Sequence, residues 1–91
     1  MNEDELLSHD NIIKIIKLFG LEVETDYWDI VNKQSIRLVS HDWIYDYHHK
    51  GYLTIYKEDG YDIILDELRN SLVQTGRNIK SREIRRALDI E

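Results

Sequence analysis

The chain contains no cysteine and no proline among its 91 residues, and only four glycines. Without cysteine it has no disulfide framework, no thiolate metal site and no thiol nucleophile, and nothing points to an oxidising compartment. The glycines stand singly, so there is no glycine-rich phosphate-binding loop. No serine has the flanking glycines of a nucleophile elbow. These absences exclude several common catalytic motifs.

Long apolar runs are also missing. The segment "NIIKIIKLFG" is interrupted by lysines, and the N-terminal "MNEDELL" is acidic where a secretory signal peptide is basic. We therefore expect a cytoplasmic protein without a membrane segment. The length suits one domain spanning residues 1–91, and no proline-rich or glycine/serine-rich linker divides it.

Charge is distributed unevenly along the chain. Eighteen acidic residues against twelve basic ones give a net charge of −6. The last fifteen residues are nevertheless basic, with five cationic side chains: Arg77, Lys80, Arg82, Arg85 and Arg86. An acidic body repels nucleic acid and is attracted to basic protein surfaces, including those that hold DNA or RNA.

Hydrophobic spacing predicts an N-terminal helix over 3–19, begun by Asn2 and Glu5 as a capping box and ended at Gly20. Helical spacing returns over 61–76, and Ser81 can cap a short last helix. Between them lie three strand-like segments, "LEVETD", "SIRLVS" and "YLTIYKE". In the first, Leu21 and Val23 share one face, but the parity has changed by Trp28 and Ile30, which indicates a bulge or turn near Thr25 and Asp26.

The segment "HDWIYDYHH" at 41–49 could be a metal site or a strand. As a helix it would place its histidines seven residues apart, too far for the usual i, i+4 ligand pair. As a strand it has favourable aromatic residues, and "HHKGY" becomes a hairpin turn. We therefore expect a strand and no metal, and a two-layer α+β domain with an N-terminal helix, a three- to four-stranded antiparallel sheet and two C-terminal helices.

Acidic residues near the second helix could resemble a catalytic carboxylate cluster, but the solvated face of an amphipathic helix explains Asp59, Asp62, Asp66 and Glu67 better. We therefore expect no catalytic residues, no cofactor and no enzymatic activity.

Tyrosines and acids together favour a protein interface instead. Eight of the nine aromatic residues lie between Tyr27 and Tyr61, more than one face of a small sheet needs for its core. Trp28 and Trp43 are the expected core members. Exposed tyrosines beside carboxylates supply contact area and hydrogen bonds at low entropic cost. The predicted partner-binding residues are Glu22, Glu24, Asp26, Asp42, Tyr45, Asp46, Tyr47, Tyr56, Glu58 and Asp59. Glu22, Glu24 and Asp26 would alternate along one face of their strand.

A short, acidic, cysteine-free chain with this order of elements resembles small phage-encoded inhibitors, in particular anti-CRISPR proteins that mimic DNA against Cas9. The resemblance covers size, charge and element order, and "LEVETD" and "YKEDGYD" are the acidic strand and turn segments within it. It implies a non-enzymatic inhibitor that binds a basic nucleic-acid-binding enzyme, such as a Cas nuclease, in the bacterial host cell.

The basic C-terminal segment supports a second hypothesis. Helix 61–76, the turn "TGRN" and "IKSREIRRAL" have helix-turn-helix proportions. A DNA-binding regulator would then use Arg77, Lys80, Arg82, Arg85 and Arg86. Alternatively, these side chains pair with acids elsewhere in the chain or on a second copy.

Overall fold

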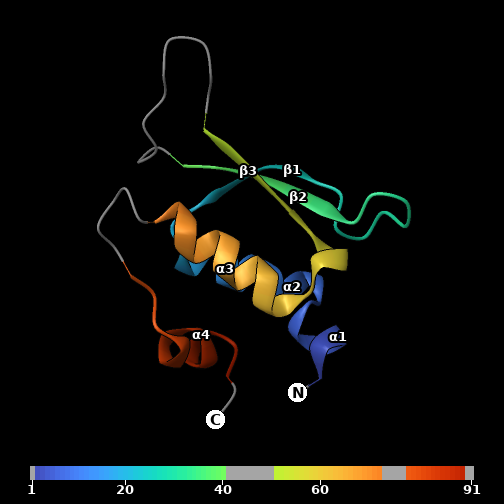
Figure 1. Cartoon of the computed structure of the whole chain (residues 1–91). Helices are drawn as coiled ribbons and strands as arrows, with labels where there is room; N and C mark the ends of the chain where they lie inside the picture. The colour runs from blue at the N-terminus through green and yellow to red at the C-terminus, as the bar shows by residue number, and fades with distance from the viewer. Residues whose placement is uncertain (1, 41–50, 73–77, 90–91) are drawn as a thin grey trace.

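The computed structural model describes residues 2–40, 51–72 and 78–89. The elements are helices α1 (Glu3–Leu6) and α2 (His9–Leu18), strands β1 (Glu22–Asp26), β2 (Ser35–Val39) and β3 (Tyr52–Tyr56), a 3-10 turn η1 (Lys57–Asp59), and helices α3 (Tyr61–Ser71) and α4 (Ser81–Ala87). The predicted α+β class is confirmed. The strands form one antiparallel sheet in the order β1-β2-β3, and α2 and α3 lie on the same side of it (Figure 1). The predicted strand at 41–48 lies outside the described residues.

The single N-terminal helix of the prediction is wrong, because the chain leaves the helical path at Leu7 and Ser8. Asn2 caps α1 as expected, with its side chain accepting from Glu5 N–H at 2.9 Å. Ser8 then adopts an extended backbone and begins a new helix, its hydroxyl accepting from Asn11 N–H at 3.4 Å. A serine between two helical segments can start a helix as well as continue one, because its side chain competes for backbone N–H groups.

Helix α2 ends where the sequence predicted. Gly20 takes a φ of 73°, and the N–H groups of Gly20 and Leu21 bond to the carbonyls of Lys17 and Ile16. This is the Schellman arrangement, in which a glycine with positive φ satisfies the last carbonyls of a helix. The chain therefore turns directly from α2 into β1.

The C-terminal helices differ from the prediction at their ends. Helix α3 is described as far as Ser71, and the remainder of the predicted span lies largely outside the described residues. Ser81 does not cap α4: it is the first helical residue, and the cap is Lys80, whose N–H donates to Glu83 Oε2 at 2.9 Å. The Ser81 hydroxyl instead accepts from Arg69 Nη2 at 3.0 Å, which ties α3 to the start of α4.

One hydrophobic core fills the space between the sheet and the helices. Ile36, Leu38 and Ile55 face inward from the sheet, against Ile15 and Ile64 among others. Trp28 is fully buried, as predicted, whereas Trp43 lies outside the described residues. Ile84 and Leu88 join the same core when α4 packs against α2 (Figure 1). The rigid inner layer fixes the positions of the side chains on the outer face of the sheet.

In the part of the chain that the structure describes, no helix is long and apolar enough to cross a membrane.

Candidate protein-binding surface

The outer face of the sheet carries no helix from the described part of the chain (Figure 1). Directly opposed residues of an antiparallel pair share a face, so the strand register assigns the side chains. Ile36 pairs with Ile55 and Leu38 with Leu53 on the inner face. The residues between them therefore lie on the outer face, together with their partners in β1: Glu22, Thr25, Ser35, Arg37, Val39, Tyr52, Thr54 and Tyr56. We call these eight residues the open face.

Arg37 is the centre of the open face. It stands opposite Thr25 on one side and Thr54 on the other, so the three residues form a row across the sheet. Its guanidinium lies 4.0 Å from the centroid of the Tyr52 ring, and its Nε lies 3.3 Å from Glu24 Oε2. Stacking on an aromatic ring and pairing with a carboxylate restrict the rotamers of a long side chain, so little entropy is lost when a partner binds.

The predicted row of three acids along β1 is wrong. The register shifts between Val23 and Thr25, which makes Glu24 the extra residue of a β-bulge. Glu22 then pairs with Val39 on the open face, whereas Asp26 pairs with Ile36 on the inner face. The sequence indicated a bulge close to this position. The prediction nevertheless continued the alternation of side chains from Glu22 to Asp26, and the extra residue in the bulge reverses the side-chain direction of the residues that follow it. All three acids are exposed, but Asp26 pairs with Ile36 and bonds to His9.

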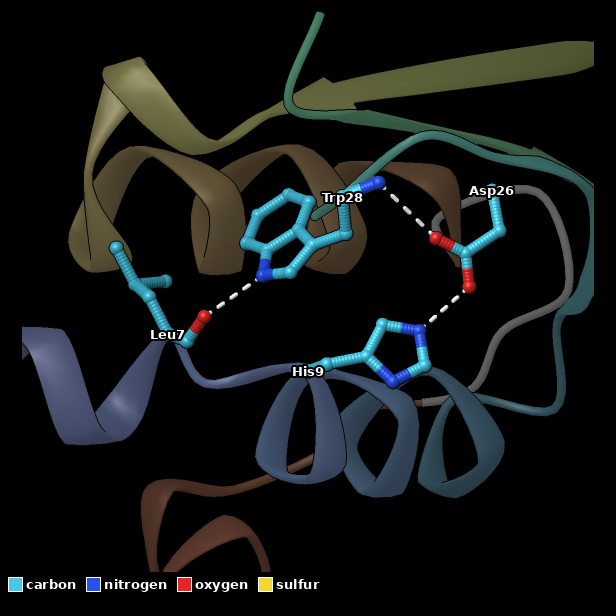
Figure 2. A network of polar contacts seen from close by, with 4 residues as sticks. All are labelled: Leu7, His9, Asp26 and Trp28. Atoms are coloured by element: carbon cyan, nitrogen blue, oxygen red, sulfur yellow. Dashed lines mark hydrogen bonds and ion pairs between the residues drawn. The ribbon is translucent and has the colours of Figure 1, made fainter. Parts of the chain in front are cut away.

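Asp26 is held in a polar network that joins four parts of the chain (Figure 2). Its Oδ2 accepts from His9 Nε2 at 2.5 Å, and its Oδ1 accepts from Trp28 N–H at 3.0 Å. The Trp28 indole N–H donates in turn to the Leu7 carbonyl at 2.7 Å. That carbonyl lies at the break between α1 and α2, so the break supplies the acceptor that a buried indole requires. The network fastens the end of β1 to the N-terminal helices.

The His9–Asp26 pair changes the pKa of both groups. The hydrogen bond to Asp26 raises the pKa of His9 above its ordinary value of 6.5, against partial desolvation. Partial burial acts to raise the pKa of Asp26, but the hydrogen bonds from His9 and Trp28 N–H outweigh it, so this pKa lies below its ordinary value of 3.8. Asp26 therefore stabilises the fold as an ion pair with His9, whereas Glu22 and Glu24 lie on the other side of the bulge, with Glu24 paired to Arg37.

The other predicted partner-binding residues fall into two groups. Tyr56 is exposed at the end of β3, and Glu58 and Asp59 follow it in η1, with Glu58 exposed and Asp59 half-buried. The remaining members lie outside the described residues: Asp42, Tyr45, Asp46 and Tyr47.

The acidic face predicted for α3 is mainly solvated, with Asp62 and Asp66 exposed. Glu67 departs from the prediction, because its Oε2 is buried and makes no hydrogen bond to any residue that the structure describes. Desolvation, reinforced by the nearby Asp59 charge, raises the pKa of Glu67. Over residues 2–40, 51–72 and 78–89, no three His, Cys, Asp or Glu side chains gather closely enough to hold a metal ion.

The cationic side chains of α4 form a separate surface. Lys80, Arg82, Arg85 and Arg86 are exposed, while Arg77 lies outside the described residues. Helix α4 makes its main packing contact with α2 rather than with α3. This geometry departs from the predicted helix-turn-helix arrangement.

The contacts of Arg37 are the feature that sequence reasoning missed. Alternation in "SIRLVS" placed Arg37 outward, but its stacking on Tyr52 depends on the pairing of β2 with β3, which no local pattern specifies.

No protein-family model matches the chain, and comparisons with curated proteins and with solved structures found no match. The residues of the open face are therefore the basis for a functional hypothesis.

Proposed function

We propose that this chain is a non-enzymatic inhibitor that binds a nucleic-acid-handling enzyme through protein contacts and covers the basic surface with which that enzyme holds DNA or RNA. The observation that carries the proposal is the open face, where Tyr52 and Tyr56 are exposed on β3, Arg37 is preorganised on β2 and Glu22 lies on β1, together with Glu24, which pairs with Arg37. Tyrosine and arginine are the residue types that dominate binding energy at protein interfaces.

Charge supports the same class of partner. The net charge of −6 attracts basic surfaces at long range and accelerates encounter with them. Short-range contacts from the tyrosines would then slow dissociation, which is the step that most differences in affinity reflect. The resemblance in size, acidity and element order to anti-CRISPR proteins makes a Cas effector such as Cas9 the first enzyme to test.

The test is a tagged pull-down from the bacterial host, treated with nuclease, followed by a binding assay with the purified enzyme that is recovered. The proposal requires an enzyme that stays bound after nuclease treatment and is displaced when its own DNA or RNA is added in excess. Recovery of nucleic acid alone, lost after nuclease treatment, would refute it.

Two charge-reversed variants identify the surface. Glu22→Lys with Glu24→Lys changes the open face, and Asp4→Lys with Asp66→Lys makes the same change of charge at exposed positions of α1 and α3. We expect the first variant to lose binding at least tenfold more than the second, with both folded by circular dichroism. Equal losses would indicate general electrostatic attraction and would remove the open face from the proposal.

A further inference from the structure

The two edges of the sheet differ in how well they are protected against pairing with another strand. Edge strands expose unpaired backbone groups, and proteins protect them with charges, bulges or proline. Strand β1 has the bulge at Glu24 and three acids, Glu22, Glu24 and Asp26. Strand β3 reads Tyr-Leu-Thr-Ile-Tyr, without a charge, and its register with β2 is unbroken from residue 52 to residue 56.

The hydrogen-bond phase of β3 shows which backbone groups face its free edge. Lys57 N–H donates to the Gln34 carbonyl at 2.9 Å, so these two residues form a hydrogen-bonded pair. Such pairs alternate along an antiparallel ladder, so Leu53 and Ile55 bond to β2. Tyr52, Thr54 and Tyr56 therefore direct their N–H and C=O groups to the edge. Across the described ranges these outward groups have no hydrogen-bond partner.

We propose that β3 pairs antiparallel with β3 of a second copy of this chain, about a two-fold axis at Thr54, to form a continuous six-stranded sheet. The sequence of β3 is nearly symmetric about Thr54. This pairing therefore sets Tyr52 opposite Tyr56, Leu53 opposite Ile55, and Thr54 opposite Thr54. Aromatic, aliphatic and threonine pairs each stabilise an antiparallel ladder.

The direction of the backbone N–H and C=O groups of β3 agrees with a two-fold axis at Thr54. Thr54 directs its N–H and C=O outward, so the two copies of Thr54 form a hydrogen-bonded pair at the centre. Tyr52 and Tyr56 also face outward, so each flanking pair is hydrogen-bonded as well. A register displaced by one residue would oppose inward-directed and outward-directed backbone groups, and depending on its direction it would set Ile55 or Leu53 against a tyrosine of the other face.

The dimer goes beyond the proposed function and does not depend on it. It would join the two open faces into one surface with four tyrosines at its centre, from Tyr52 and Tyr56 of each copy. Arg37 covers the Tyr52 ring from the β2 side. The second copy would thus add its own Tyr52 and Tyr56 to those of the first and complete the aromatic part of the joint surface.

Light scattering during size-exclusion chromatography, repeated at several protein concentrations, tests the proposal. We expect the mass to rise with concentration from 11.0 kDa towards twice that value. Thr54→Lys places two like charges opposite each other at the axis, and it should leave a monomer at every concentration. Thr25→Lys is the matched control: the same change, also beside Arg37 on the open face, but on the other edge strand.

Cysteine substitution gives an independent readout, because the natural chain has no cysteine. Paired Cα atoms in a hydrogen-bonded antiparallel pair lie ~5.5 Å apart, within the range of a disulfide. Thr54→Cys should give a covalent dimer on mild oxidation, and Thr25→Cys should give far less. A wild-type mass of 11.0 kDa at all concentrations, or equal behaviour of the residue 25 and residue 54 variants, would overturn the proposal.

Discussion

The carboxylate of Glu3 lies at the N-terminus of α3, where its Oε1 accepts a hydrogen bond from Tyr61 N–H at 3.2 Å. The two residues are separated by 58 positions in the sequence. The N-cap of helix α3 is Gly60, which has no side chain to accept a hydrogen bond, so the first N–H of the helix bonds to a carboxylate from α1. The contact joins the start of the chain to the second half of the fold.

Replacing Glu3 by alanine should lower the free energy of unfolding by about 0.5–2 kcal/mol, the usual cost of losing a helix cap. Urea denaturation followed by circular dichroism measures the change. Asp4→Ala is the control, because Asp4 is an exposed neighbour in α1. If both variants had the same stability, the contact between Glu3 and α3 would contribute nothing.

Gly60→Ala should destabilise the protein by about 1–3 kcal/mol. Gly60 has φ 91° and ψ 164°, a conformation that residues with a Cβ rarely adopt. An added Cβ would also lie 2.9 Å from Glu3 Oε1. Thermal unfolding gives the loss. In the double variant Gly60→Ala with Glu3→Ala, the loss of stability should be less than the sum of the losses in the two single variants. The reason is that Glu3→Ala removes the carboxylate that the new Cβ would contact. Strict additivity would show that backbone strain alone accounts for the effect.

The His9–Asp26 pair makes stability depend on pH on both sides. The folded-state pKa of His9 is raised, so its contribution is complete below about pH 6.5 and is lost as the pH rises through the raised value. The folded-state pKa of Asp26 is lowered, so its contribution is complete above about pH 3.8 and is lost as the pH falls through the lowered value. The pair therefore stabilises the fold most between these limits.

Urea denaturation of wild type and His9→Gln from pH 5 to pH 9 isolates this effect. The difference in stability should be largest at the acidic end and should decrease as His9 loses its proton. Glu67, whose pKa is raised, titrates in both proteins and cancels in the difference. A difference that does not change with pH would mean that the imidazole acts only as a hydrogen-bond donor.

The arginines of α4 provide the test of direct nucleic-acid binding. Arg82, Arg85 and Arg86 are exposed and form no ion pair within the described part of the chain. If they contact phosphates, replacing all three by alanine should remove a DNA affinity that falls steeply with salt. Because the body is acidic and α4 packs against α2, we expect at most weak binding in fluorescence anisotropy at physiological salt. Tight, sequence-dependent binding would favour a DNA-binding regulator over the proposed inhibitor.

The sequence alone determined the type and order of the elements. Ile12, Ile15, Ile16 and Phe19 recur at helical spacing, and Ile36 and Leu38 alternate with Arg37, because each element must bury one side. These patterns are local, so they predicted the α+β class, the inward position of Trp28 and the glycine that ends α2.

Only the tertiary structure decided how distant residues meet. The break at Ser8 leaves the Leu7 carbonyl for an indole 21 residues away, and Glu3 caps a helix that begins 58 residues later. The bulge at Glu24 moved Asp26 from the expected outer row to His9. Within the described ranges, strand order made β3 an edge whose outward groups have no hydrogen-bond partner. Each outcome depends on contacts between segments far apart in the chain, and the spacing within a single segment does not encode which segment it will meet.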